Sequence, residues 1–243
     1  FEELLKKGML KKGSDETLSF GRFCFGIPVL DKLTGGGIPR KKMSILFGPT
    51  NVGKTYIASQ IIANAQKCSS ENAIVWIDTE LSWDAIWMEK CGIDTKMVFV
   101  CQPTTGEEAF NTIKYSMNNG ADIVVLDSIA GLVPTAIQSE DFSYNPVAWQ
   151  ARFVNQSIPK LFPSLKNGTA FIVINQVRNS LGPVALDSMP GGLAQSFFAH
   201  FMLQIKRAGW IEEGNPKERV GFDIEIRCRK SKVGGEIYKS CIV

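Results

Sequence analysis

Short apolar runs alternate with longer amphipathic segments over the first three quarters of the chain. The apolar runs have the length of strands, and they span 43–47, 73–78, 97–101, 123–127 and 170–174. The run 73–78 suits a strand buried on both faces. The segments between them repeat apolar residues with helical spacing, and they span 56–68, 82–90, 106–118 and 147–165, the last interrupted near Pro159. This alternation predicts an α/β fold with a mostly parallel central sheet and helices on both faces.

The two ends of the chain follow other patterns. Charged residues and leucines alternate over residues 1–13, which suits a short amphipathic helix that packs on its own domain or on a neighbouring subunit. A short strand is expected over 18–25. After residue 200 the alternation typical of antiparallel edge strands appears, in the segments 201–206, 223–230 and 236–243. We therefore expect an N-terminal helix and linker over 1–17 and one core domain over 18–243.

Composition narrows the class of protein. The 243 residues are 44% hydrophobic and 21% charged, as in ordinary soluble proteins, and no apolar window approaches the length of a membrane span. The single histidine, His200, leaves little for a histidine metal site or a Ser-His-Asp triad. Six cysteines without a C-x-x-C pair indicate buried reduced thiols in a cytoplasmic protein. The net charge of +3 permits a nucleic-acid partner without requiring one.

One motif stands between the first apolar run and the first long helix. It reads G-x-x-x-x-G-K-T, in the strand–loop–helix context of a phosphate-binding P-loop. Its glycines let successive N–H groups point at one anion, the helix N-terminus adds partial positive charge, and the lysine reaches the β- and γ-phosphates. The residues expected to bind a nucleoside triphosphate are Gly48, Pro49, Thr50, Asn51, Val52, Gly53, Lys54, Thr55 and the following Tyr56.

Polar residues follow three of the other predicted strands. Asp127 ends an apolar run in the pattern of a Walker B aspartate, which would hold Mg²⁺ together with Thr55. Glu80 is the candidate general base or water-orienting group, with a plain surface glutamate as the alternative. Gln176 could sense the γ-phosphate or simply cap a turn. Since parallel strands bring their carboxyl ends to one edge, these groups and the P-loop should converge on one crevice.

At this point the sequence resembles a known family, the RecA/RadA-type recombinases, from about Leu18 to Cys241. The segments that carry the resemblance keep their order and spacing, and they are 48–55, 76–80, 102–107, 125–130 and 174–178. The resemblance implies a RecA-like P-loop core, hydrolysis of ATP with Mg²⁺, and self-association into a helical filament on single-stranded DNA. It also implies pairing of that DNA with a homologous duplex during recombination and repair.

The resemblance assigns roles residue by residue. Glu80 matches the catalytic glutamate, and Gln176 matches the glutamine that couples the γ-phosphate to the DNA-binding loop after it. Asp84 falls where the family contacts adenine, and Trp87 falls where an aromatic ring stacks on that base. Lys230 and Lys232 match a lysine pair that reaches the γ-phosphate of the neighbouring subunit. From the residues alone, the same lysines could belong to a solvated strand face.

Two long segments without periodicity, 135–146 and 179–192, match the family's DNA-binding loops. Apolar side chains there can wedge between bases, arginines can neutralise phosphates, and glycines allow close approach to a backbone. The residues implied for the first loop and the helix behind it are Phe142, Tyr144, Val147, Arg152 and Gln156. Those implied for the second loop are Arg178, Leu181, Gly191 and Gly192. Recognition of this kind carries little base specificity.

The function expected from these patterns is a DNA-dependent ATPase of homologous recombination, in the cytoplasm of a bacterium or of a virus-infected host. Two alternatives share the same motifs. One is a ring-shaped motor on the same core, such as a helicase or a KaiC-like ATPase. The other is a recombination mediator that binds ATP with little turnover. A nucleotide kinase is less favoured, because no lid or second acceptor site is evident.

Overall fold

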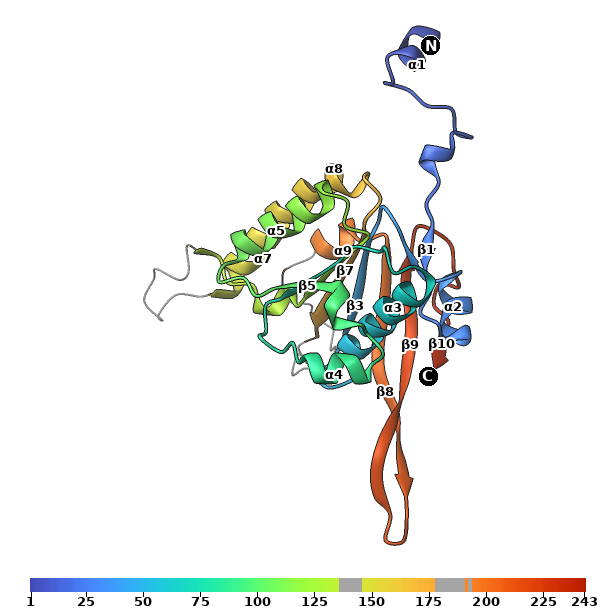
Figure 1. The fold of residues 1–243 in the computed structure, drawn as a ribbon, viewed down its shortest axis with the longest axis vertical. Helices are drawn as coiled ribbons and strands as arrows, with labels where there is room; N and C mark the ends of the chain where they lie inside the picture. Colours follow the sequence, from blue (N-terminus) through green and yellow to red (C-terminus); the bar gives the residue numbers. More distant parts are fainter. Residues whose placement is uncertain (136–145, 178–190, 192–193) are drawn as a thin grey trace.

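A computed structural model describes residues 1–135, 146–177, 191 and 194–243 of the chain. Its centre is an eight-stranded sheet in the order β10-β9-β8-β3-β7-β6-β4-β5 (Figure 1). The neighbours from β8 to β5 run parallel, whereas β8, β9 and β10 pair antiparallel. The strands are β3 (Met43–Gly48), β4 (Ile74–Asp78), β5 (Val98–Cys101), β6 (Ile123–Asp127), β7 (Ala170–Gln176), β8 (Phe201–Glu213), β9 (Glu218–Ser231) and β10 (Ser240–Ile242). The predicted α/β class with antiparallel edge strands is confirmed.

Helices cover both faces of this sheet. The α-helices after the N-terminal segment are α2 (Pro28–Thr34), α3 (Lys54–Cys68), α4 (Ala85–Lys90), α5 (Gly106–Asn118), α7 (Pro146–Ser157), α8 (Phe162–Leu165) and α9 (Ala194–Phe198). Four 3₁₀ turns join them at η1 (Glu16–Leu18), η2 (Thr95–Met97), η3 (Ile129–Gly131) and η4 (Ile158–Leu161). The long helix expected over 147–165 is thus broken at Pro159, as predicted. Among the described residues, no helix is both long and apolar enough to cross a membrane.

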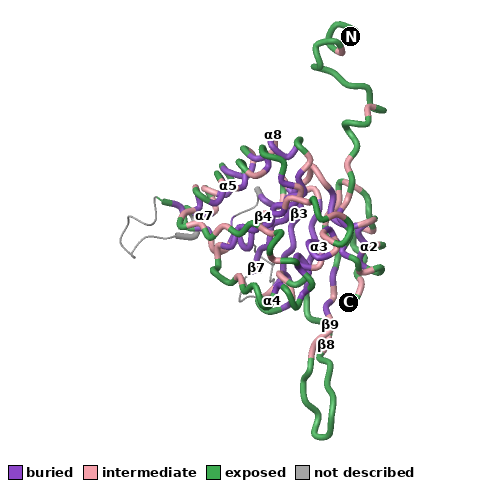
Figure 2. The backbone as a smooth tube through the Cα atoms, in the orientation of Figure 1, coloured by how far each residue is buried: buried purple, intermediate pink, exposed green. Residues whose placement is uncertain are grey.

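The sheet separates two apolar cores. Leu46 of β3 belongs to the core under α2 and α3, whereas Ile45 and Phe47 belong to the core under α5, α7 and η4. Successive side chains of a strand point to opposite faces, so a strand covered on both sides must be apolar throughout. This explains the uninterrupted apolar runs of β3, β6 and β7, and Figure 2 shows the resulting buried layer through the middle of the molecule. The edge strand β5 is apolar without this cover, since Phe99 and Val100 are exposed. Thr105 caps α5 as predicted, since its Oγ1 accepts from the Glu108 amide at 3.0 Å.

The N-terminal segment differs from its prediction. The helix α1 spans only Glu2–Lys6 and has no buried residue, although the periodic pattern extended to residue 13. Gly8 follows it with a φ of 68°, and Figure 1 shows this segment leading away from the body of the domain. A short helix gains most of its stability from packing, and none of the residues of α1 is buried against the described part of the chain. The strand expected over 18–25 shrinks to β1 (Arg22–Phe23), which pairs with β2 (Ile38–Pro39).

The antiparallel edge also differs. The strands β8 and β9 pair as far as Glu213 and Glu218, well beyond the segments 201–206 and 223–230 that alternation predicted. Their outer halves project from the sheet as a hairpin (Figure 1) that is almost wholly exposed (Figure 2). Because neither face of this ribbon is covered by the rest of the domain, its residues do not alternate between buried apolar and exposed polar positions. The expectation of buried thiols was wrong for Cys24 and Cys68, which are exposed; all six cysteines are free.

Candidate functional site

The P-loop connects β3 to α3, and its backbone shape depends on glycine at two places. A Cβ atom on Gly48 would lie 2.0 Å from the carbonyl oxygen of Ile205, so no side chain fits there. Gly53 has a φ of 88°, in the left-handed region that favours glycine. Asn51 also adopts positive φ, at 56°, which asparagine tolerates better than most residues. The loop therefore curls tightly and delivers Lys54 to the first position of α3.

The P-loop borders a cleft of about 610 Å³, within the size range of small-ligand sites. Its lining combines the P-loop and the start of α3 with residues at the carboxyl ends of three neighbouring strands. The lining residues are Thr50, Asn51, Val52, Gly53, Lys54, Thr55, Tyr56, Glu80, Trp87, Asp127, Ile174 and Gln176. The structure thus brings together the strand-end residues that the sequence placed at one crevice.

Asp127 and Thr55 face each other at the floor of the cleft. The Thr55 hydroxyl donates to Asp127 Oδ2 at 2.9 Å. Burial raises the pKa of Asp127 to about 7, although the hydrogen bond from Thr55 acts in the opposite direction and lowers it. Mg²⁺ commonly takes one carboxylate and one hydroxyl from the protein and completes its shell with phosphate oxygens and water. This oxygen pair fits that pattern, and no denser cluster of acidic, histidine or cysteine side chains occurs among the described residues.

Lys54 lies beside this pair and folds back on its own loop. Its Nζ donates to the carbonyl oxygen of Pro49 at 2.5 Å. Burial lowers the pKa of Lys54, while Asp127 and Glu80 act in the opposite direction. A lysine in this position can exchange the Pro49 carbonyl for a phosphate oxygen without moving its backbone.

Glu80 is held by donors from two other strands. Its Oε1 accepts from Nε2 of Gln176 at 2.8 Å, and the Ser128 hydroxyl donates to the same oxygen. These residues follow or end β4, β6 and β7, which are adjacent and parallel in the sheet. The arrangement orients one carboxylate toward the cleft and links it directly to Gln176, the last residue of β7.

Sequence reasoning missed the residue that shapes the loop carrying Glu80. Asp78 is fully buried, and its carboxylate accepts from the amides of Ser82 at 3.1 Å and Trp83 at 2.9 Å. It also accepts from Nε2 of Gln102 at 2.9 Å. Asp78 pairs in register with Asp127 on the neighbouring strand, so a second acidic strand end beside the Walker B position was the available signal.

Of the two residues assigned to adenine, Trp87 lines the cleft and Asp84 does not. Trp87 is half exposed, so part of its side chain is accessible to a ligand in the cleft. Tyr56 lines it as well. Asp84 is the N-cap of α4 and accepts from the Ile86 amide at 2.9 Å; it is not among the lining residues. Its contact with adenine stays a prediction.

Lys230 and Lys232 lie outside the cleft of their own chain. Lys230 Nζ donates to the carbonyl oxygens of Ser196 and Phe197, and the Lys232 ammonium lies 5.7 Å from the Phe197 ring centroid. Burial lowers the pKa of Lys230, and the nearby Lys232 lowers it further. Within one chain these lysines contact the end of α9, and their contact with a phosphate stays a prediction.

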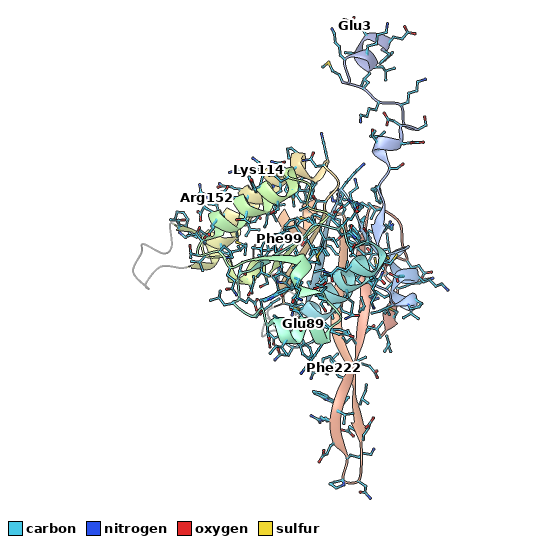
Figure 3. All side chains as sticks on the ribbon, viewed as in Figure 1. Glu3, Glu89, Phe99, Lys114, Arg152 and Phe222 are labelled. Carbon is cyan, nitrogen blue, oxygen red and sulfur yellow. The ribbon has the colours of Figure 1, made fainter. Side chains whose placement is uncertain are left out.

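The residues implied for DNA binding are only partly described. Arg152 and Gln156 are exposed on α7, and Figure 3 shows Arg152 on the side of the molecule away from the hairpin. Gly191 is buried, and a Cβ atom there would lie 2.7 Å from Ile129, so its lack of a side chain serves packing. Outside the described residues lie Phe142, Tyr144, Arg178, Leu181 and Gly192, and the side chain of Val147.

Comparison with known proteins decides the family. The family model for the RecA N-terminal domain matches residues 2–242, nearly the whole chain. The chain belongs to the RecA family. Its relatives include Protein RecA of Aquifex aeolicus, with 36% identity over 86% of this chain and 61% of the relative. The RecA proteins of Thermus aquaticus and Rubrobacter xylanophilus are 36% and 35% identical over 96% and 94% of the chain.

Family membership confirms the resemblance inferred from the motifs and agrees with the parallel sheet. The chain spans 61%, 69% and 67% of the lengths of these three RecA relatives.

Proposed function

We propose that this RecA-family chain is a DNA-dependent ATPase that assembles on single-stranded DNA and promotes its pairing with a homologous duplex. The observation that carries the proposal is the direct hydrogen bond between Gln176 and Glu80 at the P-loop cleft. Gln176 is followed at once by the segment whose sequence resembles a DNA-binding loop of the family. A DNA-induced shift of that segment would act on the carboxylate assigned to hydrolysis. We expect the protein to work in the cytoplasm, where its DNA substrates are found.

We assign each part of an ATP molecule to a group of residues in the cleft. The curled P-loop and Lys54 would hold the β- and γ-phosphates. Bound Mg²⁺, held by Thr55 and Asp127, would neutralise the charge that develops on the phosphate oxygens. Trp87 would stack on the base. These assignments rest on the donor types that line the cleft.

Glu80 is our candidate for orienting the attacking water. Ser128 and Gln176 hold its Oε1, so we assign Oε2 to the proton of the water molecule. An anionic γ-phosphate would attract the Gln176 amide away from Glu80. Binding of ATP and displacement of the residues after Gln176 are then linked through one side chain, as a nucleotide switch requires.

A filament would complete the site. Since Lys230 and Lys232 lie outside the cleft of their own chain, we propose that they reach the γ-phosphate of an adjacent copy. Hydrolysis would remove that phosphate and weaken the contact between subunits. A Lys230→Ala variant is expected to lose DNA-stimulated hydrolysis while a single copy still binds nucleotide.

The test is ATP hydrolysis measured with and without single-stranded DNA at low salt. We expect strong stimulation by DNA and its loss in Glu80→Gln, because an amide cannot take the proton of water. Glu89→Gln is the matched control, since this exposed glutamate of α4 (Figure 3) bonds Thr95 rather than the cleft. An equal rate of hydrolysis with and without DNA would favour a ring-shaped motor on the same core. A protein that binds nucleotide but does not hydrolyse it would favour a mediator.

A further inference from the structure

The base of the β8–β9 hairpin packs directly under the P-loop. The Ile205 carbonyl of β8 lies against Gly48 at the start of the loop. Ile224 of β9 lies against Gly53 at its end, where a Cβ atom would meet the isoleucine side chain at 2.8 Å. The two strands thus support both ends of the loop. The middle of the loop receives a polar contact from the same hairpin.

That contact is made by Arg207 of β8. Its Nη2 donates to the carbonyl oxygen of Asn51 at 3.1 Å. A trans peptide holds its C=O and the following N–H in opposite directions. Fixing the Asn51 carbonyl toward the hairpin therefore aims the Val52 amide the other way. Val52 belongs to the lining of both the nucleotide cleft and the cavity that Arg207 borders. An amide turned away from Arg207 therefore faces the nucleotide cleft, where a phosphate would meet an N–H donor.

The guanidinium of Arg207 is itself held by two aromatic rings. It lies 4.1 Å from the ring centroid of Trp210 and 4.9 Å from that of Phe222. The two rings contact each other edge to face, with centroids 5.9 Å apart. Arginine stacks well on aromatic faces, which reduces the freedom of its long side chain. We call Trp210 and Phe222 the aromatic clamp; Figure 3 shows Phe222 where the hairpin leaves the body of the domain.

An irregularity in β8 makes this geometry possible. Residues three apart on a regular strand point to opposite faces, so Arg207 and Trp210 should not meet. The pairing shifts between Arg207, opposite Ile224, and Gly209, opposite Asp223, which leaves Ala208 as an extra residue. This β-bulge returns Trp210 to the face of Arg207, directly opposite Phe222. Bulges that re-aim a side chain are frequent beside functional sites.

Arg207 does not reach the nucleotide cleft. It lines a second cavity of about 410 Å³, together with Pro49 and Val177, and this cavity shares Thr50 and Val52 with the nucleotide cleft. Any influence on a nucleotide must therefore pass through the loop backbone. Trp210 is one step further away, and its only described connection to the P-loop is through Arg207 and the hairpin strands.

We propose that Arg207 is a positioning residue that sets the P-loop for phosphate binding, and that the aromatic clamp holds it there. The inference rests on the proposed nucleotide site and adds to it a set of side chains on the hairpin. The aromatic clamp, Arg207 and the Asn51 carbonyl then form one continuous chain of contacts between the hairpin and the phosphate site.

The test is the affinity of the full chain for a fluorescent ADP analogue. We expect Arg207→Ala and Trp210→Ala each to weaken binding about three- to tenfold, from the range of cation–π and hydrogen-bond energies. The double variant should be no weaker than Arg207→Ala alone, because both changes break the same chain of contacts. Val220→Ala is the control, since this exposed hairpin residue belongs to no contact of the clamp. Trp210→Phe keeps a flat ring and should restore most of the affinity.

A second measurement separates positioning from general stability. Linkage is reciprocal, so ADP should slow backbone amide exchange over residues 207–222 in the unaltered chain but not in Arg207→Ala. If the unaltered chain binds ADP and both alanine variants bind within twofold of it, the positioning role is wrong and the nucleotide site stands. Failure of the unaltered chain to bind ADP would overturn both proposals. Exchange protection that persists in Arg207→Ala would also count against the contact chain.

Discussion

Asp78 offers a sharp test of how the loop that carries Glu80 is held. The Asp78→Asn substitution keeps the size of the side chain and replaces one acceptor oxygen with an NH₂ group. Asp78 accepts four hydrogen bonds, from the amides of Ser82 and Trp83, from Nε2 of Gln102 and, at 3.4 Å, from the Ser82 hydroxyl. Whichever way the new amide turns, at least one donor then faces another donor.

The size of the effect follows from these contacts. One buried N–H left without an acceptor costs about 1–3 kcal/mol. The remaining hydrogen bonds lose their charged acceptor and weaken by roughly half, while removal of a buried charge offsets part of the loss. We expect a net destabilisation of about 2–3 kcal/mol, a large share of the roughly 5–15 kcal/mol that keeps a domain folded.

The assay is urea unfolding followed by tryptophan fluorescence. Trp76 and Trp83 flank Asp78 with ring centroids 5.4 Å apart, so the signal reports on this region. The midpoint should fall by about 1 M urea. Asp94→Asn is the matched control, because this carboxylate bonds only an exposed helix-cap amide, that of Lys96, and asparagine caps helices equally well. Equal midpoints for the two variants would refute our account of Asp78.

Three further predictions concern other parts of the fold. Burial lowers the pKa of His200 to about 4 in the folded chain, from about 6.5 in the unfolded chain. As the pH falls from about 6.5 to 4, the unfolded chain binds a proton at His200 that the folded chain does not, so the free energy of unfolding decreases. His200→Asn should flatten the fall in unfolding free energy between pH 7 and pH 5 by about 1 kcal/mol after solvent screening; an unchanged slope would contradict the assignment. Gly48→Ala should prevent a stable fold, whereas Gly13→Ala, which meets nothing within 4 Å, should leave thermal unfolding unchanged. Thr105→Ala should lower the free energy of unfolding by about 1 kcal/mol through loss of the α5 cap, and a chemical-unfolding curve that overlays the unaltered one would argue against it.

The parts of the site that could be predicted from sequence follow from one rule. Parallel strands present their carboxyl ends at a common edge, so Glu80, Asp127 and Gln176 could be placed together once each strand was recognised. The P-loop could be placed from its motif between a strand and a helix. The positive φ of Gly53 is local backbone shape, whereas the need for Gly48 comes from the distant Ile205 carbonyl. The two apolar cores could be anticipated because continuous apolar runs require cover on both faces.

Other features depend on contacts that a local pattern does not contain. The sequence marks Asp78 only as a second acidic strand end, and its donors come together when the following loop folds back over it. Arg207 meets Trp210 only because a bulge shifts the strand, and no composition rule locates such a bulge. The periodic pattern of residues 1–13 describes an apolar stripe, but the length of helix that forms depends on a surface to receive it.

The position of β3 in the sheet affects how the protein is made. This strand lies between β7 and β8, and β8 begins roughly 150 residues after β3 ends. At ribosomal speeds of about 5–20 residues per second, β3 waits on the order of ten seconds or more for its second neighbour. During that interval it presents an unpaired apolar edge, which favours association with other chains. The strand that ends in the P-loop is synthesised early, but its neighbour β8 is synthesised late. Nascent chains released before residue 201 therefore carry the nucleotide motif without the partner strand β8.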